Sequence, residues 1–278
     1  MPAYDFSYAR KGLAVRVAYL AAALAYRQWL RATGQRNNLC IVLCYHAVTM
    51  EQTLRFAVQM DLVAQAAVSL EDASATRRAW PGICVTFDDA FACLLDSALP
   101  ATAERGIPTT VFAVSGNLGA PPRWAMEAGR PDAALRTMTA EELRQAESRF
   151  PCRIGSHTVS HRPLGTLDRE AATKELRTSR ATLTDILGHD VNDLALPHGS
   201  YNDETVRLAR SAGYGTVLTL DEIADPSGWP DGTIGRFLVS PDMWFIEFRL
   251  TAAGAYAWLY PWRQLIRRLR RMARGRSQ

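Results

Sequence analysis

Two adjacent aspartates, Asp88 and Asp89, follow directly after the apolar and β-branched run Ile83–Phe87 in the stretch ICVTFDDAF. Two carboxylates side by side repel each other and resist ionising together. A neighbouring metal cation removes this penalty, because its charge stabilises both ionised groups. The pair therefore predicts a cation at the mouth of a buried strand.

His157 and His161 stand four residues apart in the stretch GSHTVSHRPL. Over one helical turn, this spacing brings two imidazoles to the same side. Two imidazoles and one carboxylate suit Zn²⁺, with Co²⁺, Ni²⁺ or Fe²⁺ as related divalent ions. Asp89 is the natural third ligand, and it leaves Asp88 beside the metal. Four of the five histidines stand at or just past predicted strand ends: His46, His157, His161 and His198. The exception is His189.

Strand-like and helix-like stretches alternate along the chain, which indicates parallel strands joined by helical crossovers. A distorted (β/α) barrel is favoured over an open doubly wound sheet, and in either fold the loops after the strands build the site. Strands are predicted at 39–48, 82–87, 108–114, 152–157, 193–199 and 214–220, and helices at 91–106, 139–150, 168–188 and 202–213.

Length and composition allow a full hydrophobic core, since the chain has 278 residues of which 48% are hydrophobic. We divide it into an N-terminal helical segment (1–38), a catalytic domain (39–240) and a C-terminal region (241–278). The five cysteines include no CxxC pair and predict free thiols in a reducing compartment.

The motifs TFDDA and SHTVSH resemble the first two motifs of the polysaccharide deacetylase family, also called the NodB-homology or carbohydrate esterase family 4 group. The resemblance runs from about residue 39 to about residue 220. It implies a metal-dependent hydrolase on a distorted (β/α) barrel of this type. Carried over by position, Asp88 is the general base, and Asp89, His157 and His161 bind the metal.

Several positions depart from the family pattern. Ala90 stands where the family usually has Gly, and ALPHG has Ala195 where the third motif has the Arg that orients the base. In the same motif Pro197 fits, while His198 replaces a Tyr whose backbone N–H donates to the oxyanion. Both are expected to line the substrate site.

The general-acid histidine that the family places late in the chain has no counterpart after His198. The stretch LCYHAV resembles the Y-H-x-V motif of a circularly permuted branch, which makes His46 the candidate acid. The alternative is a structural histidine at a strand end. Trp244 is a candidate for stacking on sugar or lining an acetyl pocket, and packing is an equal alternative.

The expected reaction is removal of acetyl from an N-acetylated amino sugar of a bacterial surface glycan, or from its lipid- or nucleotide-linked precursor. Asp88 takes the proton of the attacking water, and His46 protonates the leaving amine. An acid matters more for an amine than for an alcohol, which favours N-deacetylation. The alternatives are hydrolysis of an O-acetyl ester or an N-formyl group, and a non-catalytic carbohydrate-binding protein on the same fold.

Both ends of the chain carry amphipathic or apolar segments. The apolar run Val17–Tyr26 is too short to span a bilayer, and it predicts a helix that packs on the domain or lies on a membrane surface. Residues 261–278 carry seven arginines and no acids, which is typical of a basic helix on an anionic membrane surface; a solvated or oligomer-forming tail is the alternative. We therefore expect a cytoplasmic protein, peripheral on the inner face of the inner membrane. Basic residues gathered in one tail do not indicate a nucleic-acid partner.

Overall fold

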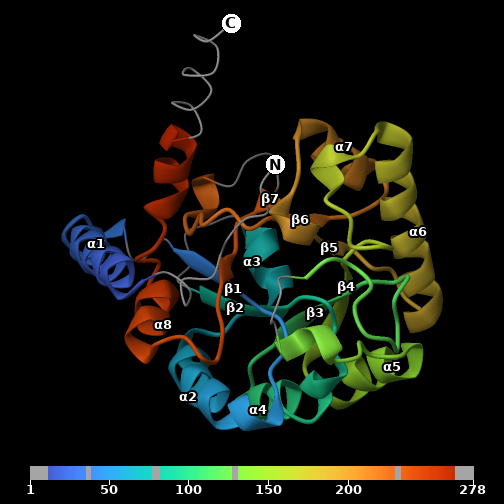
Figure 1. Cartoon of the computed structure of the whole chain (residues 1–278), viewed down its shortest axis with the longest axis horizontal. Coiled ribbons are helices and arrows are strands. Elements are labelled where there is room, and N and C mark those ends of the chain that lie inside the picture. Colours follow the sequence, from blue (N-terminus) through green and yellow to red (C-terminus); the bar gives the residue numbers. More distant parts are fainter. Residues whose placement is uncertain (1–11, 36–38, 77–81, 127–130, 229–232, 267–278) are drawn as a thin grey trace, which may run out of the picture.

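A single eight-stranded sheet forms the centre of the protein in the computed structural model (Figure 1), which describes residues 12–35, 39–76, 82–126, 131–228 and 233–266. Neighbouring strands run parallel in the order β7-β6-β5-β4-β3-β2-β1-β8. The strands are β1 Cys40–Tyr45, β2 Gly82–Phe87, β3 Thr109–Ala113, β4 Cys152–Ser156, β5 Asp193–Ala195, β6 Thr216–Leu218, β7 Thr233–Ile234 and β8 Phe237–Leu238.

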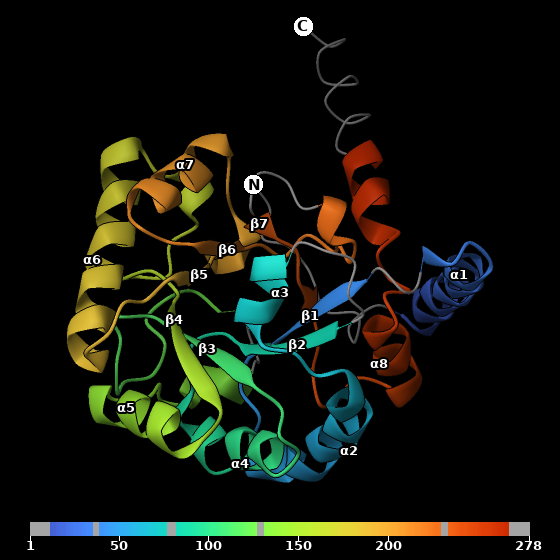
Figure 2. The same cartoon turned by 180° about the vertical axis from the view of Figure 1, so that it is seen from behind.

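Helices surround this sheet, as the two opposite views show (Figures 1 and 2). α2 and α3 join β1 to β2, and one helix each joins the next four pairs of strands, as expected for parallel crossovers. The helices are α1 Leu13–Ala32, α2 Thr53–Val63, α3 Leu70–Thr76, α4 Ala98–Ala103, α5 Ala140–Arg149, α6 Arg169–Leu187, α7 Asp203–Ser211 and α8 Phe245–Ala252.

The two edge strands of the sheet are consecutive in the chain. β7 pairs with β6 at one edge and β8 pairs with β1 at the other, yet only Gly235 and Arg236 lie between them. The three peptide units from Ile234 to Phe237 span about 10 Å at most. The sheet must therefore curl until its edges approach, which confirms the predicted distorted barrel.

The interior of the curled sheet is lined by alternate residues of the strands. Cys40 and Val42 of β1, Cys84 of β2 and Phe112 of β3 form one buried cluster, whereas the residues between them pack under the helices. Because side chains alternate along a strand, the next inward positions towards the carboxyl end of β2 are 86 and 88. This periodicity brings Asp88 to the top of the barrel interior.

Helix boundaries follow local sequence in most places. Thr139 and Glu142 form the predicted capping box of α5, Asp168 accepts from the Ala171 N–H at 2.8 Å, and Gly188 ends α6 with φ 77°. The single helix predicted at 91–106 is wrong. It is divided into a 3₁₀ turn at Ala92–Leu95 and α4, because Pro100 has no N–H and is tolerated only in the first turn of a new helix.

The predicted N-terminal helix is confirmed as part of α1. Its Arg16 guanidinium binds the Glu247 carboxylate of α8 at 2.7 Å, so one side of α1 packs on the domain. Within the described residues, no helix has the length and hydropathy needed to cross a bilayer. Residues 259–266 form one more helix, and the rest of the predicted basic tail lies outside the described residues. All five cysteines are free, as predicted.

Gly235 tests how tightly the sheet closes. A Cβ at this position would lie 2.3 Å from the Asp221 carbonyl oxygen and 2.9 Å from the Ile223 nitrogen, both of them backbone atoms. We expect Gly235→Ala to lower the free energy of unfolding by about 1–3 kcal/mol, the usual cost of overpacking. Urea denaturation measures this. Gly215→Ala is the control, because its Cβ would meet nothing closer than 3.9 Å. Equal stability of the two variants would contradict the tight closure.

Candidate active site

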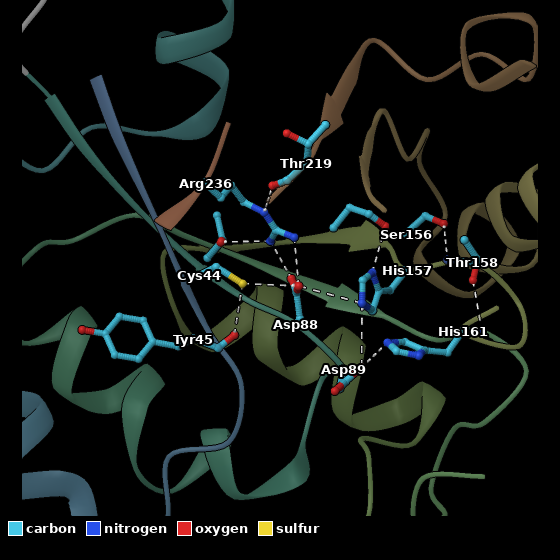
Figure 3. Close-up of polar contacts among 12 residues, drawn as sticks. Cys44, Tyr45, Asp88, Asp89, Ser156, His157, Thr158, His161, Thr219 and Arg236 are labelled. Carbon is cyan, nitrogen blue, oxygen red and sulfur yellow. Dashed lines mark hydrogen bonds and ion pairs between the residues drawn. The ribbon is translucent and has the colours of Figure 1, made fainter. Parts of the chain in front are cut away.

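Asp88 forms a buried, two-point ion pair with Arg236 (Figure 3). The two guanidinium nitrogens donate to Oδ1 at 2.6 Å and to Oδ2 at 2.9 Å. Arg236 is fully buried at the junction of β7 and β8, and its Nε donates to the Thr219 carbonyl oxygen at 3.1 Å. The residue that closes the sheet therefore holds the carboxylate in place.

Asp88 is held ionised by its surroundings. Burial alone raises the pKa of a carboxyl group, but the charge and hydrogen bonds of Arg236 outweigh it and hold the pKa of Asp88 well below its usual range. The Cys44 thiol lies 3.3 Å from Oδ2 and acts as a donor, because burial raises the thiol's pKa well above its ordinary value. The base candidate is thus a fixed anion.

Arg236 corrects one conclusion from the sequence. Ala195 does occupy the position where the family's orienting Arg was expected, so the motif lacks that residue. The guanidinium is instead supplied by Arg236 from a different segment of the chain. The dipeptide Gly235–Arg236 has no residue pattern that reveals this role. Only the proximity of the two sheet edges brings it to Asp88.

Asp89 leaves the strand in a left-handed turn. Its φ is 69° and that of Ala90 is 48°, so two successive non-glycine residues adopt a conformation that favours glycine. This turn aims the Asp89 carboxylate at the histidines instead of the opposite face of the sheet. It also explains why the family motif usually has Gly at the position of Ala90. Here the Ala90 methyl is fully buried in the core.

Asp89, His157 and His161 converge at one point and are all buried. The Nε2 atoms of the two imidazoles lie 3.8 Å and 3.4 Å from Oδ1 of Asp89. Ligand atoms about 2.0–2.1 Å from a tetrahedral Zn²⁺ are about 3.3 Å apart, so these separations fit one ion with little movement.

The two imidazoles are in the protonation state that metal ligation requires. Burial is the main cause that lowers the pKa of both His157 and His161, which keeps them neutral. Nδ1 of His157 lies 2.8 Å from the Ala195 carbonyl oxygen, and donating there leaves the Nε2 lone pair free, 3.8 Å from both Asp88 Oδ2 and Asp89 Oδ1. The residues present therefore fit a divalent cation.

The loop between the two histidines is held by Glu175 of α6. One carboxylate oxygen accepts from the backbone N–H groups of Val159 and Ser160, both at 2.9 Å, and the other accepts from the Ser160 hydroxyl. These bonds fix a segment in which Thr158 and His161 have φ values of 67° and 58°. Sequence reasoning missed Glu175, although a glutamate in the middle of the following helix is nearly buried there.

His46 directly follows β1, next to the cluster. Its charge is among the causes that act on the pKa values of Asp88 and His161, after the dominant effect of burial on both groups. The half-buried ring of His46 therefore lies within electrostatic range of Asp88, the candidate base, and of His161 in the candidate metal site. Its role as the general acid stays a prediction.

The remaining predicted substrate residues lie in different places. His198 has φ 57° in the 3₁₀ turn Pro197–Gly199, and its exposed ring packs edge-on against His161 at 4.6 Å between centroids, beside the buried Pro197. Trp244 directly precedes α8, and the Arg16 guanidinium of α1 lies over its ring, 3.7 Å from the ring centroid. The described contact of Trp244 is therefore with α1, and its sugar-stacking role stays a prediction. Trp124, which sequence reasoning missed, stacks on His161 at 4.6 Å.

A curled parallel sheet with an Asp-His-His cluster and a separate tethered carboxylate defines a barrel of the carbohydrate deacetylase type. The sequence profile described as "Polysaccharide deacetylase" matches residues 78–217, half of the chain. The chain therefore belongs to the polysaccharide deacetylase family. Membership in the circularly permuted branch stays a prediction.

Individual relatives are distant. The curated Bacillus subtilis protein YxkH, assigned by name to the polysaccharide deacetylases, is 23% identical over 161 residues; the match covers 58% of this chain and 52% of YxkH, so it spans about half of that protein. The solved structure of IcaB from Ammonifex degensii is 25% identical with a TM-score of 0.62, covering 79% of this chain and 98% of IcaB. The Streptococcus pyogenes deacetylase PplD, solved with acetate, is 20% identical with a TM-score of 0.61, covering 77% and 98%.

Glu175 provides a test of how the loop supports the cluster. Glu175→Gln replaces an acceptor of two backbone N–H bonds with an amide, and we expect metal affinity to fall by about 10- to 100-fold, the usual effect of removing a residue that orients ligands. Competition with a chromophoric chelator measures the affinity. Glu170→Gln, an exposed position in the first turn of the same helix, should bind as wild type does. An unchanged affinity for Glu175→Gln would contradict the role.

Arg236→Met leaves the Asp88 carboxylate buried without its counter-charge. We expect a loss of about 3–5 kcal/mol in the free energy of unfolding, measured by urea denaturation. The double variant Asp88→Asn/Arg236→Met should recover part of this loss. Arg153→Met is the control, because its pair with Glu71 is exposed and contributes at most about 1 kcal/mol. A loss for Arg236→Met no larger than the control's would contradict the importance of the pair.

Proposed function

We propose that this protein is a metal-dependent N-deacetylase that removes acetyl from an N-acetylated amino sugar. The observation that carries this proposal is the division of the adjacent aspartates between unlike partners. Asp89 lies near two neutral imidazoles, whereas Asp88, which is also 3.8 Å from Nε2 of His157, is tethered by two hydrogen bonds to Arg236. One carboxylate thus belongs to a cation site, and the other remains beside it as a proton acceptor.

Asp89, His157 and His161 would hold the divalent ion, with Zn²⁺ the first expectation from this donor set. When bound, such an ion acidifies water and polarises a carbonyl group. Asp88 needs this assistance, because Arg236 keeps it ionised but also makes it a weak base. Its own task is to accept the proton of the attacking water from a fixed position.

His46 would complete the reaction by protonating the departing nitrogen. An amide nitrogen leaves poorly without a proton, whereas an ester oxygen leaves more readily. A histidine near Asp88 therefore favours cleavage of an N-acetyl group over an O-acetyl group. The backbone N–H of His198 is our candidate donor to the oxyanion that forms on the carbonyl oxygen.

The family to which the chain belongs points to a carbohydrate substrate. We propose an amino sugar of a bacterial surface glycan, or its lipid- or nucleotide-linked precursor. We also propose that the protein works in the cytoplasm on the inner face of the inner membrane, with residues 261–278 on the lipid surface. The five free thiols, typical of reducing compartments, and the seven arginines of that tail support this location.

The decisive experiment measures acetate release from a panel of N-acetylhexosamines together with bound metal. We expect Asp88→Asn to keep its metal and to lose at least about 100-fold in rate, because a positioned general base contributes about 10²–10⁴. His161→Ala should lose the metal as well as the activity. Asp96→Asn, an exposed aspartate in the segment that follows, should retain both.

Other outcomes separate the competing functions. Wild type that holds metal but releases acyl groups only from O-acetyl or N-formyl sugars would be a related hydrolase with another specificity. Wild type that binds sugars and releases no acyl group would be a binding protein. Metal binding by His161→Ala equal to that of wild type would contradict the ligand assignment.

A further inference from the structure

Exposed large hydrophobic side chains are confined to one side of the molecule. Within the described residues they lie on α1, on α2 and the 3₁₀ turn before it, at the start of α8 and on helix 259–266, and none falls between residues 59 and 243. α8 contacts both α1 and α2. The four elements lie on one side of Figure 1, from the red helix 259–266 at the upper left to α2 at the lower left, and on the opposite side of Figure 2. We call this surface the apolar flank: Leu13, Val15, Val17, Leu24, Trp29, Met50, Leu54, Val58, Trp244, Phe245, Ile246, Trp262 and Leu265.

α1 is apolar on the side that faces away from the domain. Leu13, Val17 and Leu24 recur at helical spacing, with an exposed alanine between them at position 21. The opposite side packs on the domain through Tyr19, which contacts Trp258, and through the buried Ala23. A helix that is apolar on both sides is normally covered on both sides. The outer side of α1 therefore indicates a second contact surface.

Formal charge is distributed in the same way as the exposed apolar side chains. Among the described residues of the two segments that hold the apolar flank, 12–58 and 244–266, there are six arginines and two glutamates, a formal charge of +4. The described residues from 59 to 243 include 14 basic and 23 acidic residues, a formal charge of −9. An apolar surface in basic surroundings complements a surface that is both apolar and anionic.

We propose that the apolar flank docks on the surface of an anionic lipid bilayer, with the outer side of α1 in the interfacial region. A symmetric dimer through the same flank is disfavoured, because a two-fold axis would place the two basic surfaces against each other. Lipid headgroups supply the opposite charge, and the acyl boundary covers the apolar side chains. This inference concerns binding and does not depend on the reaction proposed above.

The flank reaches the rim of the candidate active site. The loop that follows β1 contains both His46 and the exposed Met50. Gln52, two residues further, donates to the Asp242 carboxylate at 2.5 Å, just before the exposed Trp244. Docking through this flank would place the site mouth beside the bilayer surface, where a sugar carried on a lipid is presented.

Vesicle sedimentation tests the proposal on the full chain. Sucrose-loaded vesicles of phosphatidylcholine, with or without phosphatidylglycerol, are mixed with wild type and with Val17→Glu/Leu24→Glu, whose parent side chains are 51% and 41% exposed. We expect wild type to bind the anionic vesicles, and the double variant to bind them about tenfold more weakly or worse, because charged side chains replace apolar ones at the interface.

The matched control is Thr178→Glu/Ala181→Glu, which makes the same change in net charge at exposed positions of α6 on the opposite side. It should bind vesicles nearly as well as wild type. Both double variants should keep the wild-type melting temperature and the wild-type rate on a water-soluble N-acetylhexosamine, which separates docking from catalysis.

Three results would overturn the proposal. The first is equal binding of wild type to neutral and anionic vesicles, or to neither. The second is vesicle binding by Val17→Glu/Leu24→Glu equal to that of wild type while deletion of residues 267–278 abolishes it. The third is a wild-type dimer in light scattering that Val17→Glu/Leu24→Glu converts to a monomer, which would make the flank an interface between copies of this chain.

Discussion

The buried pair of Asp88 and Arg236 is the constraint on which the rest of the site depends. Neither charge is stable in the barrel interior without the other, because desolvating a lone ion costs several kcal/mol. Arg236 reaches Asp88 only when the sheet has curled and β7 and β8 have joined opposite edges. The closure of the fold therefore supplies the charge that keeps the buried Asp88 carboxylate ionised.

Backbone strain is gathered around the same site. The non-glycine residues with positive φ among those described are Asp89, Ala90, Thr158, His161 and His198. Each such conformation costs about 1–3 kcal/mol and persists only where the surroundings enforce it. The enforcing contacts here are core burial of the Ala90 methyl and the hydrogen bonds of Glu175 to the loop. The strain is the cost of bringing the three candidate ligands Asp89, His157 and His161 together.

Sequence patterns predicted those features that depend on neighbours in the chain. The apolar run before Asp88 and the capping box at Thr139 identified β2 and α5, and the order of strands and helices identified the barrel. The Asp-His-His cluster followed because parallel strands end at the same edge. Features that depend on contacts distant in sequence escaped, including Glu175 and Trp124 at the cluster. The two-residue strands β7 and β8 are too short to show periodicity, and Arg236 functions only through the edge-to-edge approach that they create.

The order of the chain gives the link at Gly235 and Arg236 a consequence for biogenesis. Asp89, His157 and His161 all precede it, so a nascent chain contains all three candidate metal ligands before the counter-charge of Asp88 has been synthesised. A protease cut between β6 and β7 would likewise break the covalent link between the Asp-His-His cluster and Arg236. The contact that fixes Asp88 can thus form only after the chain has been synthesised past Arg236.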